Sequence, residues 1–149
     1  MIAYLDTSAV VPILIAEPST QRCREVWDEA DGLVTSQLTF VEVAAALAAA
    51  QRAERITPSQ RRRAWANFEH AWPDIDVLDL TAELCQSAAG FAWTQALRGY
   101  DAVHCASAHA VSDPDLVAVS GDAQLLGAWH RLGIAVLDTN AASLSEAKQ

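Results

Sequence analysis

Four acidic side chains in this sequence are each isolated from other charges within an apolar segment: Asp6, Glu42, Asp101 and Asp122. Asp6, for example, is the only charged residue among residues 1–16. An ionised carboxylate in an apolar core costs several kcal/mol unless it is paired or coordinates a metal ion. If the four acids meet, a hard divalent cation that prefers oxygen ligands would relieve their mutual repulsion. The pattern indicates a carboxylate site for a divalent metal ion, on the assumption that the chain brings these residues together.

Helix capping is a simpler explanation for the three aspartates, because Asp is a favoured N-cap residue and each of them precedes a predicted helix. Glu42 cannot be explained in this way, since it falls inside a predicted helix. It shares a stripe at i±3 and i±4 spacing with apolar residues that we expect to face the core: Leu38, Ala45 and Ala49. A single Glu within a helix is usually solvated, so the case for Glu42 depends on taking the four acids together.

Other polar residues near these acids are candidates for supporting roles. His104 lies three residues after Asp101 on the same predicted helix face, although such a histidine is more often a satisfied core residue. Thr7, Ser8 and Ser120 could hydrogen-bond the acids or a water molecule in the site, with helix capping as the alternative. The five tryptophans are interpreted as packing or interface residues.

Strands alternate with helices along the chain. Each predicted strand is a short, continuously apolar run, as expected when helices cover both faces of a parallel sheet. The predicted strands are residues 2–5, 33–35, 76–80, 116–119 and 134–137. The predicted helices are one entered at residues 6–8, residues 19–30, 37–53, 81–97 and 101–112, and a short one after residue 122 that runs to about 131, with another opening at 57–58. This order predicts an α/β protein, a three-layer α/β/α sandwich around a mainly parallel sheet of four to five strands.

The predicted topology also indicates where a ligand would bind. In open α/β sheets the ligand lies beyond the carboxyl ends of the strands, where the strand order reverses. Asp6 and Asp122 both follow predicted strands, so we expect them at that edge. Glu42 follows the second strand by one to two helical turns and can reach the same edge.

Length and composition suit one small domain. We place it at residues 1–142 of the 149, with residues 143–149 as a C-terminal tail that we expect to be flexible. No segment predicts a membrane span or a signal peptide, so we expect a cytoplasmic protein that does not contact a membrane. Three widely spaced cysteines are expected to be reduced thiols without a chemical role: Cys23, Cys85 and Cys105.

The net charge of −9 should repel nucleic acids at long range. Any nucleic-acid chemistry must then depend on local cations, of which a bound divalent metal ion is one source. The only basic cluster in the sequence is Arg52, Arg55, Arg61, Arg62 and Arg63. Contact with an RNA backbone, docking of an acidic segment of a partner protein and a merely solvated helix face are three alternatives for it.

Four motifs, in this order and spacing, resemble those of PIN-domain ribonucleases, in particular the VapC-type toxins of bacterial toxin–antitoxin pairs. The motifs are Tyr4-Leu5-Asp6-Thr7-Ser8, Thr39-Phe40-Val41-Glu42-Val43, Tyr100-Asp101-Ala102-Val103-His104-Cys105-Ala106-Ser107-Ala108 and Ser120-Gly121-Asp122-Ala123-Gln124-Leu125. Each motif alone is weak, whereas their order and spacing together are specific and span nearly the whole chain.

The resemblance implies an endoribonuclease that depends on Mg²⁺ or Mn²⁺, a homodimer, and a cognate antitoxin that occludes the site. Asp6 and Asp101 would be the firmest metal ligands, with Glu42 and Asp122 binding directly or through water. Many relatives carry a further acid just after the fourth motif, but residues 123–125 supply none here. The number of metal ions therefore stays open.

Two other functions are weighed against this one. A metal-dependent phosphohydrolase with an aspartyl nucleophile usually needs an acid two residues after the nucleophile and a lysine near the site. Ser8 occupies that position, and the only lysine is Lys148. A non-catalytic PIN-like binding module is disfavoured by the presence of all four acids. The RNA target cannot be read from these motifs, and DNA cleavage stays open.

Overall fold

The computed structural model describes residues 1–111 and 113–142, so the predicted tail at residues 143–149 lies outside the described residues. Five strands form one sheet in the order β3-β2-β1-β4-β5, and every neighbouring pair is parallel. The strands are β1 (Ile2–Leu5), β2 (Gly32–Ser36), β3 (Asp76–Leu78), β4 (Leu116–Ser120) and β5 (Ala135–Asp138). The predicted parallel sheet is confirmed.

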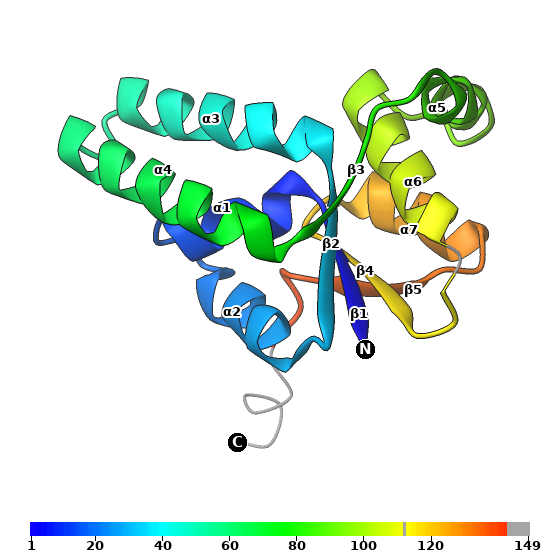
Figure 1. Cartoon of the computed structure of the whole chain (residues 1–149), viewed down its shortest axis with the longest axis horizontal. Coiled ribbons are helices and arrows are strands. Elements are labelled where there is room, and N and C mark those ends of the chain that lie inside the picture. The colour runs from blue at the N-terminus through cyan, green and yellow to red at the C-terminus, as the bar shows by residue number, and fades with distance from the viewer. Residues whose placement is uncertain (112, 143–149) are drawn as a thin grey trace.

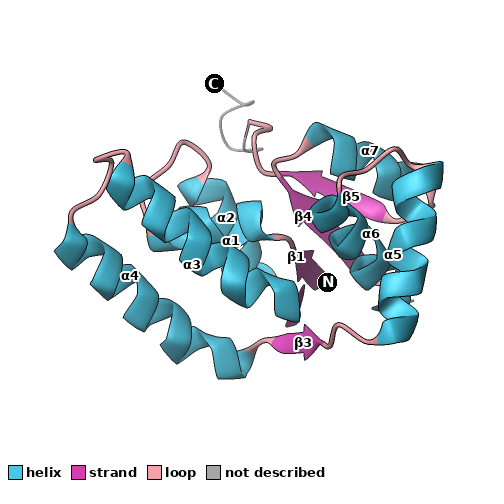
Figure 2. Ribbon diagram, turned by 90° about the horizontal axis from the view of Figure 1, so that it is seen from above, coloured by secondary structure: helices cyan, strands magenta, loops and turns pink. Residues whose placement is uncertain are grey.

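Helices cover both faces of this sheet, as Figure 1 and Figure 2 show. One layer consists of α1 (Thr7–Leu14), α2 (Thr20–Glu29), α3 (Gln37–Arg52) and α4 (Pro58–Ala71). The other consists of α5 (Ala82–Thr94), α6 (Gly99–Val111) and α7 (Ala123–Arg131). A short 3₁₀ turn, Trp72–Asp74, joins α4 to β3. The three-layer α/β/α arrangement agrees with the prediction, and α3 and α4 extend side by side beyond the sheet (Figure 1).

Successive residues of β1 enter two different cores, because neighbouring side chains in a strand point to opposite faces of the sheet. Ala3 and Leu5 pack with the α1–α4 layer, whereas Tyr4 packs with the α5–α7 layer. In that second core the Tyr4 ring lies edge-on to the fully buried Trp129, with 5.8 Å between ring centroids. Burial on both faces explains why this strand is apolar throughout.

Element boundaries differ from the prediction between the end of β3 and the start of α6. The third strand ends at Leu78 rather than at residue 80, and α5 ends at Thr94 rather than at residue 97. Ala96 adopts φ 52°, a left-handed conformation that cannot continue a right-handed helix. Because α6 begins at Gly99, Asp101 lies within its first turn and does not cap it.

The structure bears on two further expectations. No helix in the described part of the chain is both long and apolar enough to cross a membrane. The three cysteines are free, as expected. Burial raises the pKa of Cys23 and of Cys105 to about 11, which keeps both as unreactive thiols at neutral pH.

Candidate active site

A cavity of about 390 Å³ lies where the strand order reverses, between the carboxyl ends of β1 and β4. The four isolated acids all line it: Asp6, Glu42, Asp101 and Asp122. They come from four separate segments, namely the end of β1, α3, α6 and the loop after β4. Thr7, Ser8 and His104 line the same cavity. The fold therefore brings the four acids together with three of the polar residues that the sequence singled out.

Asp6 is the most deeply buried of the four acids, with 5% of its surface exposed. It follows β1 directly and caps α1, accepting a hydrogen bond from the Ala9 N–H at 3.2 Å. Ser8 Oγ donates to Asp6 Oδ1 and Ser120 Oγ donates to Oδ2, each at 2.7 Å. Burial raises the pKa of Asp6, although the charge of His104 and these hydrogen bonds oppose the rise. Asp6 thus caps a helix and lines the cavity at once.

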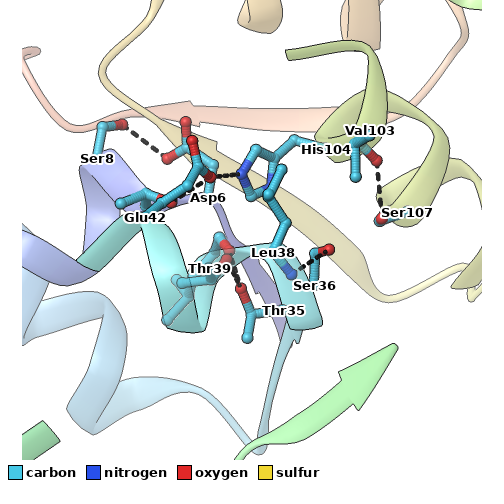
Figure 3. Close-up of polar contacts among 12 residues, drawn as sticks. Asp6, Ser8, Thr35, Ser36, Leu38, Thr39, Glu42, Val103, His104 and Ser107 are labelled. Carbon is cyan, nitrogen blue, oxygen red and sulfur yellow. Dashed lines mark hydrogen bonds and ion pairs between the residues drawn. The ribbon is translucent and has the colours of Figure 1, made fainter. Parts of the chain in front are cut away.

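Glu42 reaches the cavity because hydroxyl groups dock the start of α3 onto the end of β1. Thr35 Oγ1 donates to the Leu5 carbonyl at 2.6 Å and lies 2.8 Å from Thr39 Oγ1. Glu42 follows Thr39 by about one helical turn, which carries its side chain toward Asp6 (Figure 3). There Glu42 Oε1 accepts a hydrogen bond from Thr7 Oγ1 at 2.7 Å.

The prediction that Glu42 shares a core-facing stripe with Ala45 and Ala49 is wrong. Ala45 and Ala49 are exposed, because α3 packs through a neighbouring stripe of Thr39, Val43, Leu47 and Ala50. Glu42 lies at the border of that stripe, with 23% of its side chain exposed. Burial alone would raise the pKa of Glu42, but the hydrogen bond and charge of His104 and the hydrogen bond of Thr7 lower it overall. These contacts favour an ionised Glu42.

His104 contacts the site directly. Its ring is almost fully buried, and Nε2 lies 2.6 Å from Glu42 Oε1. Figure 3 shows the imidazole reaching from α6 toward the Glu42 carboxylate. On its other side, His104 Nδ1 lies 2.8 Å from the Tyr4 hydroxyl. His104 therefore joins the acid of α3 to the first strand.

Asp101 and Asp122 share an arginine. Arg98 Nε donates to Asp101 Oδ2 at 3.2 Å, and Arg98 Nη2 lies 3.8 Å from Asp122 Oδ2. The Arg98 side chain is 74% exposed, and Asp122 also caps α7 by accepting a hydrogen bond from Leu125 N–H at 2.9 Å. Exposed ion pairs of this kind are worth only about 0.2–1 kcal/mol, so Arg98 can leave the acids at small cost.

The loop that carries Asp122 is held from both sides. The Gly121 N–H donates to Ser8 Oγ at 2.8 Å, and Asn140 Nδ2 donates to the Gly121 carbonyl at 2.9 Å. A Cβ atom on Gly121 would lie 3.0 Å from Thr139 Oγ1 and 3.2 Å from Asn140 Nδ2, so a side chain here would have to displace these two neighbours by a few tenths of an ångström. The segment after β5 therefore helps to fix the fourth acid.

The predicted arginine cluster lies where α3 ends and α4 begins, at the end of this pair that points away from the sheet (Figure 1). Arg52 follows Glu42 by ten residues of α3, or about 15 Å along the helix axis. Arg55 pairs with Glu17 at 3.2 Å, and Glu17 itself lines the acidic cavity. Within the described residues none of the five arginines lines that cavity.

The donor chemistry of the cavity suits a hard divalent cation, because Mg²⁺ and Mn²⁺ prefer carboxylate oxygens. The donors that contact the Asp6 carboxylate are all neutral. Glu42 Oε2 and Asp101 Oδ1 accept no hydrogen bond from the described residues. As placed, no group of three or more Asp, Glu, His or Cys side chains in the described part of the chain could hold a metal ion. The acids are gathered, but Arg98 holds two of them.

Comparison with known proteins agrees with this geometry. The model of the PIN domain family matches residues 3–126. The chain is 40% identical over 135 residues to Ribonuclease VapC45 and to Ribonuclease VapC49, both of Mycobacterium tuberculosis, which covers 91% of this chain and 94% of each relative. The chain therefore belongs to the PIN-domain family.

Solved structures support the fold assignment. PAE2754 from Pyrobaculum aerophilum superposes with a TM-score of 0.67 at 19% identity, covering 100% of this chain and 97% of that one. A toxin–antitoxin complex from Klebsiella pneumoniae superposes with a TM-score of 0.65 at 13% identity, covering 94% of this chain and 99% of that one. At such low identities the likeness establishes the fold alone.

Sequence reasoning missed three residues at this site: Tyr4, Glu17 and Arg98. For Arg98 a signal existed, because it precedes Asp101 by three residues at the start of a helix. Tyr4 belongs to the apolar run of β1, where its hydroxyl gave no sign of a polar partner. Glu17 lies in the link between α1 and α2, and no local pattern could place it beside the cavity.

Proposed function

We propose that this chain is a divalent-metal-dependent endoribonuclease and the toxin of a toxin–antitoxin pair. The observation that carries the proposal is the single cavity lined by carboxylates from four separate segments. Two relatives at 40% identity bear the name ribonuclease, and a structural neighbour is a toxin–antitoxin complex. The substrate class is accordingly the RNA phosphodiester.

In this proposal Asp6 and Asp101 hold Mg²⁺ or Mn²⁺, and Glu42 and Asp122 contribute directly or through water. When bound, such a cation activates water for in-line attack on the phosphate and neutralises charge that develops in the transition state. Arg98 must release Asp101 and Asp122 for both acids to contribute. Its exposed guanidinium is then free to attract a phosphate group at the rim of the cavity.

The remaining polar groups orient the acids. Ser8 and Ser120 each occupy one oxygen of Asp6, and both hydrogen bonds restrict rotation of that carboxylate. Thr7 restricts Glu42 in the same way through a single oxygen. No side-chain nucleophile is required. The three donors around Asp6 also argue against a phosphohydrolase mechanism in which this carboxylate attacks the phosphate.

The direct test is cleavage of RNA by the purified protein in Mg²⁺, in Mn²⁺ and in excess EDTA, with a single-stranded DNA in parallel. We expect cleavage products with a 5′-phosphate and a 3′-hydroxyl, and no products in EDTA. A metal-free ribonuclease typically leaves a 2′,3′-cyclic phosphate instead. Full activity in EDTA would contradict the mechanism.

A variant of one acid tests the site itself. We expect Asp101→Asn to abolish cleavage while the fold persists, because loss of one carboxylate relieves repulsion among the acids. Asp79→Asn makes the same change at an exposed position outside the cavity and is the matched control. Calorimetric titration of Mg²⁺ on both variants tests the alternative of a non-catalytic binding module. Such a module would bind the ion without cleaving RNA.

The proposal includes two protein partners, a cognate antitoxin that occludes the cavity and a second copy of this chain. For the arginine cluster we favour docking of an acidic antitoxin segment over contact with RNA inside the cleft, since Arg52 lies about 15 Å along α3 from Glu42. Light scattering of the free chain and of its antitoxin complex measures both assemblies.

A further inference from the structure

Three side chains from three elements form a continuous hydrogen-bonded chain beneath the cavity. The Tyr4 hydroxyl of β1 lies 2.8 Å from His104 Nδ1, and His104 Nε2 of α6 lies 2.6 Å from Glu42 Oε1 of α3. Tyr4 is fully buried and His104 is 2% exposed, so water does not compete for these contacts. These hydrogen bonds connect β1 to Glu42, an acid of the candidate active site.

The partners of His104 determine which of its ring nitrogens carries a proton. If the neutral His104 ring carried its proton on Nδ1, the lone pair of Nε2 would face the Glu42 carboxylate at 2.6 Å, which is repulsive. A ring with a proton on Nε2, whether neutral or cationic, instead donates a charge-assisted hydrogen bond to Glu42. The Tyr4 phenol can donate to an unprotonated Nδ1, or accept from Nδ1 when the ring is cationic, and either arrangement leaves a proton on Nε2. Tyr4 thereby selects the form of His104 with its proton on Nε2.

We propose that His104 is a positioning residue that orients Glu42 for catalysis, and that Tyr4 holds His104 in the donor form that this role needs. The proposal rests on the ribonuclease function proposed above. His104 and Thr7 both use Glu42 Oε1, from separate elements, so the carboxylate is fixed while Oε2 accepts no hydrogen bond from the described residues. A fixed carboxylate with one free oxygen is suited to bind a cation or a site water.

The first test needs neither RNA nor metal. Nitrogen-15 NMR of the histidine rings in the metal-free wild-type protein should show His104 protonated on Nε2, with a downfield proton that exchanges slowly. In Glu42→Gln the charged acceptor is lost, so this proton resonance should move upfield. A wild-type His104 ring with its only proton on Nδ1 overturns the proposal.

The second test compares variants that keep or remove the donor. His104→Leu fills a similar volume without a donor, and we expect it to lower Mg²⁺ affinity and kcat by about 10–100-fold with little change in KM for RNA. His104→Gln places an amide N–H near the position of Nε2 and should recover most of both quantities. Tyr4→Phe keeps the ring contact with Trp129 and should give an intermediate loss.

Folding and function are separated by controls. All variants are assayed at least 15 °C below their own Tm, and His130→Gln on the exposed side of α7 is the matched histidine control. If His104→Leu and His104→Gln lose Mg²⁺ affinity equally while folded, His104 has only a packing role and the proposal is overturned. If the wild-type chain cleaves no RNA, the proposed function fails, whereas the NMR and Mg²⁺ titrations still decide whether His104 positions Glu42.

Discussion

The guanidinium of Arg98 lies 3.2 Å from the carboxylate of Asp101, three residues further along the chain in the first turn of α6, and both side chains line the acidic cavity. The same guanidinium lies 3.8 Å from Asp122, so one arginine bridges two of the four acids. It also occupies the oxygens that a divalent cation would use, which makes Arg98 a competitor for that cation.

Arg98→Gln is therefore expected to bind Mg²⁺ about two- to fivefold more tightly than the wild-type chain, the range that loss of an exposed ion pair permits. Isothermal titration calorimetry at low ionic strength measures the change. Arg24→Gln removes the same charge from an exposed position on α2 and controls for net charge. Weaker Mg²⁺ binding in Arg98→Gln alone would show that Arg98 assists the cation instead of competing with it.

Asp6→Asn should stabilise the metal-free protein at neutral pH. Burial raises the folded-state pKa of Asp6, so the folded chain binds this proton more tightly than the unfolded chain does. Wild-type stability consequently falls as pH rises from the unfolded value of about 3.9 through the folded pKa, and the loss persists above it. Asn cannot ionise and still accepts the capping hydrogen bond from Ala9 N–H.

We expect the Tm of Asp6→Asn to exceed that of the wild type by about 2–4 °C at pH 7, and the gap to close below about pH 4. Thermal unfolding followed by circular dichroism in EDTA measures this, with Asp79→Asn as the control at an exposed position. A gap that grows as the pH falls would mean that the ionised Asp6 stabilises the fold.

The features that could be predicted from the sequence are those that depend on local pattern. The apolar run of β1 and the polar residues directly after it predicted both a buried strand and the place of Asp6 at the sheet edge. Because parallel strands end at one edge, the same reasoning placed Asp122 beside Asp6. The α/β class and the alternation of strands and helices follow from such patterns, whereas the meeting of all four acids had to be assumed.

The features that could not be predicted depend on how separate elements face each other. Regular 3.6-residue spacing fits several neighbouring stripes of α3. Its packing against other elements, chiefly α1 and α4, selects the stripe of Val43 and Leu47 over that of Ala45. The contact between Tyr4 and His104 joins residues 100 positions apart. No local periodicity contains that information, so both the partner of His104 and the orientation of Glu42 required the structure.

Gly121→Ala is expected to destabilise the protein by about 1–3 kcal/mol and to lower RNA cleavage. The added methyl group would lie 3.0 Å from Thr139 Oγ1 and 3.2 Å from Asn140 Nδ2, so it would displace these side chains and strain the hydrogen bond by which Asn140 holds the loop of Asp122. Gly90→Ala, in α5, meets no atom within 4 Å and should instead stabilise by about 0.5–1 kcal/mol. Urea unfolding of both variants provides the comparison, and an unchanged midpoint for Gly121→Ala would contradict the close approach.

Replacing Arg61, Arg62 and Arg63 together with Gln should weaken antitoxin binding at least tenfold and leave kcat for a short RNA within twofold of wild type. These arginines lie in the first turns of α4, outside the acidic cavity. Attraction between an acidic segment and exposed arginines is screened by salt, so the loss of affinity should be largest at low ionic strength. Surface plasmon resonance with the cognate antitoxin at two salt concentrations measures it.

Two other results of this triple substitution have definite meanings. Unchanged antitoxin affinity with a raised KM for RNA would assign the cluster to the RNA backbone, and no change in either would leave it a solvated helix face. Arg61 also donates to Gln51 at 2.6 Å across the α3–α4 pair. Because Arg61→Gln alone removes that contact, it serves as the matched control. If Arg61→Gln alone reproduces the loss of antitoxin affinity, the effect comes from a displaced α4 and not from the charge of the cluster.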